Sequence, residues 1–473
     1  MFKNILKIQY ILFFVLAAAA AAGSSELAYK INTIVTSKNV SSCQFSVSVS
    51  NPRNGETVSS FRPERKLIPA SNMKLITTSA ALEYLGSDYV FDTRVYLHEG
   101  DLIIQGSGDP LLGDADTNEI KGKEQFWEIK AITDALKSAG VKSIKNICVN
   151  SFIFDHVLIH PSWPREQLNR YYAPQVCGIN YNGNCITVRA GNNGKLWYTT
   201  VPETNYVNIS SKASITSSGG NTLWCSRPPE TNNMTLFGKC RSSTVDILVT
   251  INNPAMYFGM LVGEAVLKEG ISVQGQGSIL EKYCPEPGKT KPLATFSHTL
   301  EDVMIRCNRD SFNLTAECLV KTISAKNSTH NINGEWPHGL KLVARHLEKL
   351  GFKENQDFQL DDGCGLSRKN LVSSALLCGV LNNIYNSPDA EMFLDTLAIG
   401  GVEGSAPVRR YFTQSDYRGK ILAKSGTING VKALSGICKT DSGDYTFSVI
   451  VNKANGHSRG AINEIVKAII DCL

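Results

Sequence analysis

Residues 69–74 read PASNMK and place Ser71 three positions before Lys74. Apolar residues at helical spacing follow and stop at Gly86, which predicts a helix from about Ser71 to Leu85. Residues three apart share one face of a helix, so the Ser71 hydroxyl and the Lys74 amine are expected side by side at its N-terminus. Such an amine can take the hydroxyl proton and create a nucleophile. The structural alternative is a capping serine followed by a surface lysine.

Two further motifs in the second half of the chain carry compatible chemistry. Residues 311–313 read SFN at the head of a helical segment, where a serine can relay a proton and an asparagine amide can hold a carbonyl. Residues 424–427 read KSGT after a strand-like segment, where an extended peptide can lie alongside and a lysine can receive a carboxylate. Taken alone, the SFN motif can be explained as helix capping, and the KSGT motif as a charged edge strand and turn. Together, in this order and context, the three motifs predict a serine acyltransferase.

The residues around these motifs resemble a known family. The segments are PASNMK at 69–74, GSGDP at 106–110, YAP at 172–174, AE at 316–317 and DGCGLSR at 362–368. Through them, from about residue 40 to its C-terminus, the chain resembles the class C low-molecular-mass penicillin-binding proteins, which are D-alanyl-D-alanine carboxypeptidases and endopeptidases. The long insertion between the first two motifs is a mark of that family, and serine β-lactamases lack it.

The resemblance implies an α/β (α+β) fold, with a discontinuous transpeptidase domain of the penicillin-binding/β-lactamase type and a large β-rich inserted region. Helical segments and strands at both ends of the chain enclose short alternating runs separated by Gly, Asn and Ser, which agrees with this arrangement. We expect the catalytic domain at 26–90 and 291–473 and the inserted domain or domains at 91–290. Within the insertion we expect the polar stretch 204–233 to form loops.

The same resemblance implies roles for the motif residues. Ser71 would attack the D-Ala-D-Ala carbonyl with Lys74 as general base. The backbone N–H groups of Ser71 and Thr427 would form the oxyanion hole. Ser311 would pass the proton to the departing D-alanine or amine, and Asn313 would hold the substrate amide.

Substrate binding follows from the resemblance, with some departures. Lys424 would steer the terminal carboxylate. Ser425 stands where relatives usually carry threonine, Phe312 where they often carry a polar residue, and Cys364 where serine is common. We expect little effect at 425, an altered pocket wall at 312 and a thiol near the cleft at 364. The expected binding strand consists of Lys424, Ser425, Gly426 and Thr427.

Recognition of the stem-peptide side chain is a further departure. In relatives an acid shortly after a Trp-Pro pair recognises the amino group of that side chain. Here the segment 163–167 reads WPREQ, and the position that aligns with the acid is Gln167. Its acidic neighbour Glu166 is therefore the expected contact.

The first residues have the pattern of a secretory signal peptide. Lys3 and Lys7 precede an apolar run at 10–16, and small residues follow to Ser25. We expect a signal peptide at 1–22 and an exported protein of the periplasm or cell envelope, and a retained N-terminal anchor helix is the alternative. No later stretch is long and apolar enough for a stable membrane span.

Charge and cysteine content bear on nucleic-acid binding, disulfide bonds and metal binding. The excess of 48 Lys and Arg over 43 Asp and Glu is diffuse, so no nucleic-acid partner is expected. Among 13 cysteines, Cys177/Cys185 and Cys225/Cys240 are close enough in sequence for disulfides. The alternative is that most cysteines are small buried apolar residues. There is no C-x-x-C, and the two histidines four apart in 156–160 lack the acid of an H-E-x-x-H, so no metal or other cofactor is expected.

The leading hypothesis is a peptidoglycan DD-carboxypeptidase or DD-endopeptidase that acts on stem peptides through a Ser71 acyl-enzyme and binds β-lactam antibiotics covalently. A serine β-lactamase uses the same chemistry, and the long insertion disfavours it. A catalytically degenerate protein that only binds peptidoglycan or β-lactams is the third hypothesis. The presence of all five polar residues assigned to the site (Ser71, Lys74, Ser311, Asn313 and Lys424) disfavours it.

Overall fold

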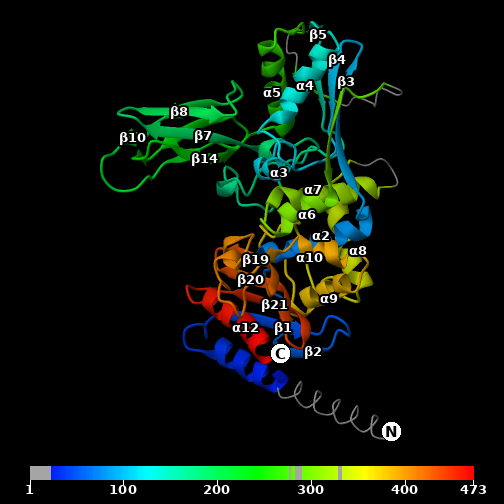
Figure 1. Cartoon of the computed structure of the whole chain (residues 1–473), viewed down its shortest axis with the longest axis vertical. Helices are drawn as coiled ribbons and strands as arrows, with labels where there is room; N and C mark the ends of the chain where they lie inside the picture. Colours follow the sequence, from blue (N-terminus) through cyan, green and yellow to red (C-terminus); the bar gives the residue numbers. More distant parts are fainter. Residues whose placement is uncertain (1–22, 276–278, 283–289, 329–332) are drawn as a thin grey trace. The chain divides into compact units, whose positions relative to one another are not determined.

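The computed structural model describes residues 23–275, 279–282, 290–328 and 333–473, so the signal peptide expected at 1–22 lies outside the described residues (Figure 1). The chain divides into two compact units. Unit 1 comprises Met1–Glu83, Met304–Ser311 and Leu340–Leu473, and unit 2 comprises Tyr84–Val303 and Phe312–Gly339. The domain limits expected at 90 and 291 stay a prediction.

An antiparallel sheet built from both ends of the chain is the centre of unit 1. Within the described residues its six strands lie in the order β18-β19-β20-β21-β1-β2. The N-terminal β1 therefore pairs with the C-terminal β21, and Gln44 lies opposite Asn452. The central strands have long buried runs, as expected where a sheet is covered on both faces. The bounds are β1 Gln44–Ser50, β2 Thr57–Phe61, β18 Ala398–Ile399, β19 Ile421–Ile428, β20 Val431–Thr440 and β21 Gly443–Asn452.

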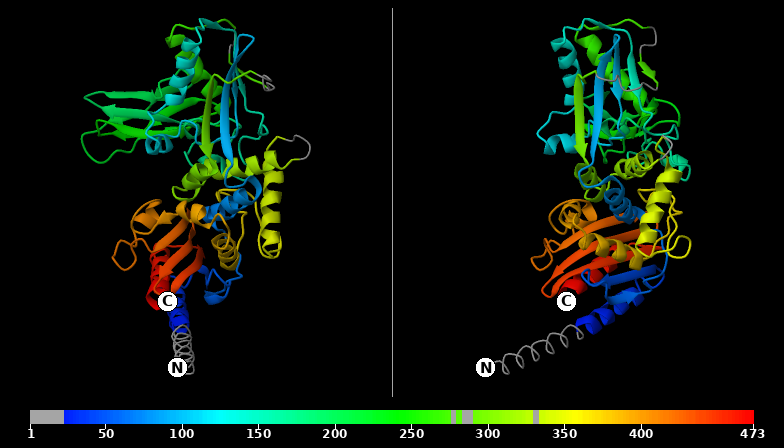
Figure 2. Two further views of the ribbon diagram at one scale, coloured as in Figure 1. Left: turned by 45° about the vertical axis from the view of Figure 1, so that its right-hand side comes forward. Right: turned by 90° about the vertical axis from the view of Figure 1, so that its right-hand side faces the viewer.

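Helices cover both faces of this sheet. On one face, the helix at 23–36 and α12 (Ser458–Cys472) share a core with alternate strand residues such as Val47, and Figure 2 shows them side by side in blue and red. On the other face, α9 (Ser374–Tyr385) contacts β1 through the hydrogen bond from Ser46 to Ser374. The remaining helices with residues in unit 1 are η1 Ala70–Asn72, α2 Met73–Leu85, α6 Leu300–Asn308, α8 Trp336–Lys349, α10 Ala390–Asp395 and α11 Ala406–Arg409.

Unit 2 is rich in β structure. Its described residues form a five-stranded sheet with the order β16-β6-β4-β3-β17 and two three-stranded sheets with the orders β14-β7-β8 and β11-β12-β9. The helices α4 (Trp127–Ser138) and α5 (Pro254–Lys268) contribute to one core with these sheets. The other elements are β3 Val90–His98, β4 Asp101–Gln105, α3 Ala115–Ile120, β5 Ser143–Ile144, β6 Ile147–Asn150, η2 Arg165–Gln167, η3 Asn182–Asn184, β7 Cys185–Asn192, β8 Leu196–Val201, β9 Asn208–Ser211, β10 Ser214–Ile215, β11 Trp224–Ser226, β12 Asn233–Phe237, β13 Lys239–Cys240, β14 Val245–Thr250, β15 Ser272–Val273, β16 Ile279–Glu281, β17 Ala294–Thr299 and α7 Asn313–Lys326.

The fold class predicted from the sequence is confirmed, including the discontinuous domain and the β-rich region. The expectation of loops over 204–233 is wrong, because β9, β10 and β11 lie in that stretch. These strands have two to four residues, and their outward positions are often Ser or Asn. The sequence therefore lacks the longer alternation of apolar and polar residues that predicts a strand. No helix in the described part of the chain is long and apolar enough to cross a membrane.

Four cysteines of unit 2 are buried free thiols. Cys177, Cys185, Cys225 and Cys240 do not form the two disulfides suggested by their spacing, so that pairing is wrong. Burial raises the pKa of Cys177 to about 11 and the pKa of Cys185 to about 12. A thiol with a raised pKa carries little thiolate at neutral pH and reacts slowly. These residues pack as small apolar side chains, as the alternative interpretation holds.

A buried ion pair joins two segments of unit 2. His298 on β17 places Nδ1 2.7 Å from Oδ2 of Asp109, and both side chains are almost completely buried. Burial alone lowers the pKa of His298, but the charge of Asp109 and the hydrogen bond to it outweigh burial, so that pKa is raised overall. The same Asp109 also accepts a hydrogen bond from the Leu111 backbone N–H, which shapes the loop after β4.

We predict that this pair makes stability pH-dependent. A histidine pKa raised by folding stabilises the folded state fully below the unfolded pKa of about 6.5, and the stabilisation is lost as pH rises through the folded pKa. The free energy of unfolding should therefore fall from pH 6 to pH 8 by on the order of 1 kcal/mol more in the wild type than in His298→Gln. Urea unfolding across this range measures the effect. The exposed His98→Gln serves as control, and equal pH profiles for wild type and His298→Gln would contradict the prediction.

Candidate active site

Ser71 lies in the short helix η1, which leads directly into α2. The preceding Ala70 has a positive φ of 48°, which costs an L-residue roughly 1–2 kcal/mol. Asn72 fastens this turn to the sheet, because its Nδ2 donates to Ser435 Oγ on β20 at 2.5 Å. Ala70 and Asn72 are buried, whereas Ser71 keeps partial exposure. The turn is therefore fixed through its buried residues Ala70 and Asn72, and the hydroxyl of Ser71 stays partly accessible to solvent.

Lys74 meets Ser71 as the spacing predicts. Its side chain is completely buried, and Nζ donates to Ser71 Oγ at 3.1 Å and to the Cys364 backbone carbonyl at 2.9 Å. Burying a charged or polar amine is costly unless hydrogen bonds satisfy it. The carbonyl of Cys364 provides such a bond and fixes the amine beside the hydroxyl. A backbone carbonyl has no sequence signature, so residue spacing alone could not assign this contact.

The loop that carries this carbonyl is itself tightly held. Asp362 accepts hydrogen bonds from the backbone N–H groups of Gly365 at 2.7 Å and Ser367 at 2.6 Å. Thr77 on α2 donates to the carbonyl of Gly363 at 2.7 Å. The Cys364 side chain is fully buried and its Sγ donates to Asp362 Oδ2 at 3.8 Å, so the thiol belongs to the loop beside Lys74 and is not exposed to solvent. The segment DGCGLSR thus supports the amine through its backbone.

Strand β19 runs beside the Ser71 turn. A Cβ added to Gly426 would lie 2.8 Å from the carbonyl oxygen of Pro69 and 3.1 Å from the backbone nitrogen of Ser71. Glycine at 426 therefore allows the two backbones to approach. In the same way, a Cβ on Gly365 would lie 1.9 Å from the carbonyl oxygen of Ala70. Two glycines thus bring a strand and a loop against the nucleophile turn.

Cationic groups gather along β19. Lys424 is fully buried, and its pKa lies well below the usual value because of burial first and the positive charge of Lys74 second. Arg459 on α12 donates through Nη2 to Thr427 Oγ1 at 3.1 Å, and burial lowers its pKa to about 10. Its Nη1 is buried without a hydrogen-bond partner among the described residues. Ser425 Oγ lies 2.9 Å from Ser405 Oγ, which holds the KSGT segment from its other side.

Ser311 follows α6 at the end of a unit 1 segment. It has a positive φ of 66°, which is uncommon for serine. Asn308, three residues earlier, donates to Thr396 Oγ1 at 2.9 Å and to Thr78 Oγ1 on α2 at 3.2 Å. The segment that presents Ser311 is therefore anchored to the helix that carries Lys74.

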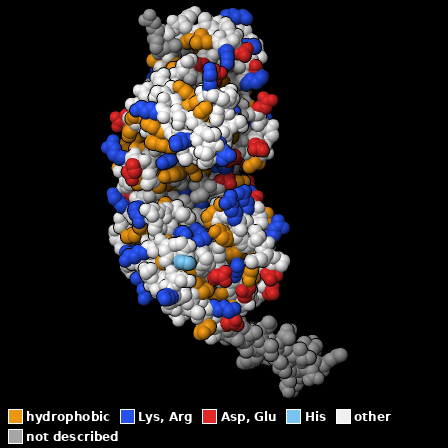
Figure 3. Space-filling model, turned by 90° about the vertical axis from the view of Figure 1, so that its left-hand side faces the viewer, with side chains coloured by type: hydrophobic (Ala, Val, Ile, Leu, Met, Phe, Trp, Pro, Cys, Tyr) orange, Lys and Arg blue, Asp and Glu red, His pale blue; other side chains and the backbone are white. Residues whose placement is uncertain are grey.

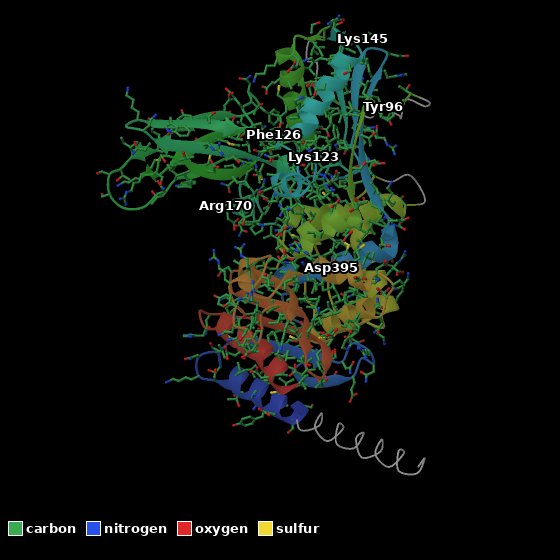
Figure 4. The ribbon with its side chains drawn as sticks, viewed as in Figure 1. Tyr96, Lys123, Phe126, Lys145, Arg170 and Asp395 are labelled. Atoms are coloured by element: carbon green, nitrogen blue, oxygen red, sulfur yellow. The ribbon has the colours of Figure 1, made fainter. Side chains whose placement is uncertain are left out.

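Asn313 and Glu166 belong to unit 2. Asn313 opens α7, and its Nδ2 donates to the backbone carbonyl of Tyr172 at 2.7 Å, which joins the SFN and YAP motifs. Glu166 is exposed in η2. Arg170, labelled in Figure 4, lies between Glu166 and the YAP motif and pairs with Val249 in an isolated β-bridge, so this segment contacts β14 at that residue. The roles expected for Asn313 and Glu166 in catalysis and substrate binding stay predictions.

The fold and the Ser-Lys pair define the class as a serine-type hydrolase with a penicillin-binding fold. The sequence profile of the D-Ala-D-Ala carboxypeptidase 3 (S13) family matches residues 27–471. The chain therefore belongs to this family, and the prediction of a serine-type D-Ala-D-Ala carboxypeptidase is confirmed.

Individual relatives agree with this assignment. A D-alanyl-D-alanine carboxypeptidase of Actinomadura sp. (strain R39) is 28% identical over 95% of this chain and 85% of its own length. The D-alanyl-D-alanine carboxypeptidase DacB of Haemophilus influenzae is 22% identical over 88% of this chain and 86% of its own length. The crystal structure of penicillin binding protein 4 from H. influenzae has a TM-score of 0.76 at 19% identity and covers 93% of this chain and 98% of its own.

We predict that Gly365→Ala impairs the site although it adds only a methyl group. Gly365 has φ +84°, and the methyl would collide with the Ala70 carbonyl oxygen beside Ser71. Gly419 has the similar φ of +79° and nothing within 4 Å, so Gly419→Ala carries the backbone cost without the collision. Hydrolysis of a D-Ala-D-Ala peptide should fall at least about 100-fold in Gly365→Ala and less than about threefold in Gly419→Ala. Equal rates in the two variants would contradict the prediction.

Proposed function

We propose that the chain hydrolyses the D-Ala-D-Ala end of peptidoglycan stem peptides, and D-Ala-linked cross-links, through an acyl-enzyme on Ser71. The observation that carries this proposal is the 3.1 Å contact between Ser71 Oγ and Nζ of the buried Lys74. Family membership supports the substrate. The cross-link activity is supported by a peptidoglycan endopeptidase of Bdellovibrio bacteriovorus, whose structure has a TM-score of 0.50 and 14% identity and covers 90% of this chain and 92% of its own.

The proposed reaction has two stages. Ser71 Oγ adds to the carbonyl carbon while Lys74, in its neutral form, takes the hydroxyl proton. The backbone N–H groups of Ser71 and Thr427 stabilise the oxyanion, a feature worth about 3–4 kcal/mol per donor. The C–N bond then breaks, and Ser311 relays the proton held by Lys74 to the departing amine, so that both Lys74 and Ser311 return to their starting protonation states. Water attacks the ester in the second stage, which releases the new carboxylate and restores the Ser71 hydroxyl.

Carboxylate recognition is proposed for the cations along β19. The substrate would lie beside β19 as an added strand, and its terminal carboxylate would face Lys424 and Arg459. Arg459 suits this role because its buried Nη1 has no hydrogen-bond partner among the described residues. A guanidinium binds a carboxylate through charge-assisted hydrogen bonds. The hydroxyls of Ser425 and Thr427 would complete the binding strand with Gly426.

Asn313 and Glu166 are proposed to contact the rest of the peptide. The hydrogen bond from Asn313 Nδ2 to Tyr172 fixes the rotation of the amide, and a fixed amide is suited to hold a substrate amide. Glu166 is exposed, as a group that contacts the amino group of a stem-peptide side chain has to be.

β-Lactam binding and location are part of the same proposal. Penicillin binding protein 4 of H. influenzae has been crystallised in complex with a β-lactam, and that chain has a TM-score of 0.71 and 19% identity and covers 92% of this chain and 97% of its own. We infer that β-lactams acylate Ser71 here. Because peptidoglycan lies outside the cytoplasmic membrane, we also infer that the chain works in the periplasm or cell envelope after export.

We predict that benzylpenicillin forms one lasting covalent adduct with the wild type and none with Ser71→Ala. The adduct lasts when water reaches the penicilloyl ester slowly. Intact-protein mass spectrometry after incubation measures it, with the exposed Ser41→Ala as a matched control that should be acylated normally. Rapid drug loss without an adduct would point to a serine β-lactamase instead. If the wild type forms no adduct and the drug is not consumed, the catalytic assignment is refuted.

We predict that Arg459→Ala weakens binding of the terminal carboxylate. The loss of a charge-assisted hydrogen bond costs about 1.5–3 kcal/mol, so KM for a D-Ala-D-Ala peptide should rise about 10- to 100-fold with a smaller change in kcat. Arg459→Lys should restore part of the loss, and the exposed Arg410→Ala should have no effect. The same peptide with a C-terminal amide is the decisive comparison. If Arg459→Ala impairs the hydrolysis of acid and amide equally, the role in carboxylate binding is wrong.

A further inference from the structure

One sheet of unit 2 has a face that the acyl-transfer chemistry does not use. In β11-β12-β9, Trp224 lies opposite Phe237, and Asn233 lies opposite Asn208. The alternate residues on these strands, such as Leu236, are buried in the core of unit 2. The other face points outward, and we call it the outer face. Its residues are Trp224, Ser226, Asn233, Thr235, Phe237, Asn208, Ser210 and Lys212.

An aromatic platform forms one end of the outer face. Trp224 and Phe237 stack with ring centroids 4.7 Å apart and an interplanar angle of 15°. The Trp224 side chain is nevertheless 45% exposed, so a large apolar surface remains in contact with water. Lys212 places its Nζ 5.7 Å from the Phe237 ring centroid, which adds a cation beside the platform. Tryptophan is enriched at binding surfaces because it combines a large apolar ring with a polar N–H group.

A row of small polar side chains continues from the platform. Ser210 Oγ and Thr235 Oγ1 lie 3.1 Å apart, and Asn208 Nδ2 lies 3.3 Å from Asn233 Oδ1. Asn208, Ser210 and Asn233 are exposed. Hydroxyls and amides can both donate and accept hydrogen bonds, so this row can match a ligand with the same mixture of groups.

We propose that the outer face binds the glycan strands of peptidoglycan. A pyranose ring offers a flat C–H surface to an aromatic ring, and its hydroxyl and acetamido groups can exchange hydrogen bonds with the Ser, Thr and Asn row. The repeating sugars of a linear glycan would extend from the Trp224 platform along that row. The inference goes beyond the proposed reaction, because it concerns how the enzyme holds the polymer rather than how it cleaves the peptide.

Charge selects this occupant over a second copy of the chain. The exposed residues of 206–243 include three basic residues, Lys212, Lys239 and Arg241, against the single acid Glu230. Stem peptides carry free carboxylates, and removal of a stem peptide frees the lactyl carboxylate of its muramyl group, so the polymer is anionic with or without peptides and its charge complements these exposed cations. Two copies of the same basic face would repel each other. Figure 3 shows one face of the molecule, on which hydrophobic side chains lie among lysines and arginines in small groups.

The test uses full-length protein and glycan strands from which the stem peptides have been removed, so that the proposed reaction has no substrate. Trp224→Ala should weaken binding of these strands at least about tenfold, as expected when an aromatic anchor is lost. Trp224→Phe should keep binding within about threefold, because it retains an aromatic ring. Lys212→Gln should weaken binding and reduce its salt dependence. Tyr198→Ala removes another exposed aromatic ring of unit 2 and should leave binding unchanged.

A second measurement separates this proposal from the proposed function. Trp224→Ala should hydrolyse a soluble D-Ala-D-Ala peptide at the wild-type rate and intact insoluble peptidoglycan several-fold more slowly. One outcome would refute only the proposed reaction: neither the wild type nor any variant hydrolyses the peptide, but Trp224→Ala still weakens glycan binding. Glycan binding that is equal in Trp224→Ala and Tyr198→Ala would overturn the glycan proposal. A wild-type dimer that Trp224→Ala converts to a monomer, with unchanged glycan binding, would also overturn it and assign the face to a second copy.

Discussion

The burial of Lys74 beside Ser71 is the constraint on which the rest of the site depends. An amine removed from water needs hydrogen-bond acceptors, and here one acceptor is the nucleophile and another is the Cys364 carbonyl. That carbonyl stays in place because Asp362 holds the loop around it. The contacts of the site in unit 1 thus extend from one buried nitrogen to a hydroxyl, a loop and a helix.

The site also requires three backbone segments to approach one another closely. A serine turn, a loop and a strand converge within a space that side chains would fill, and glycine stands at the two contact points, 365 and 426. The turn also contains Ala70 in a left-handed conformation, so part of the folding energy of unit 1 maintains a strained geometry. Stability and reactivity are therefore coupled here: the packing that stabilises the sheet also keeps Ser71 in position.

The sequence predicts the parts of this site that depend on local spacing. The helical juxtaposition of Ser71 and Lys74 and the strand that carries Lys424 follow from patterns a few residues long. Arg459 could not be predicted in this way, because it lies 32 residues beyond Thr427 and reaches it only through the packing of α12. The Cys364 contact uses a backbone atom, which leaves no trace in the choice of residue. The short strands of unit 2 are not predicted, because most of their outward side chains are polar and the sequence there resembles a loop. The same polar side chains form the hydrogen-bonding row of the outer face.

The pairing of β1 with β21 has a consequence for how the enzyme comes into being. The strand that starts at Gln44 can pair with β21 only after the residues up to Asn452 have been made, and more than 400 residues separate Gln44 from Asn452 in sequence. Until then β1 has an unpaired edge, and the turn that carries Ser71 lacks the strands that anchor it. Residues 84–303 form most of unit 2 as one continuous segment and are free to fold earlier. A chain cut short before β19 lacks the central strands of the sheet and the KSGT segment of the site, so the topology delays hydrolytic activity until β21 has been made.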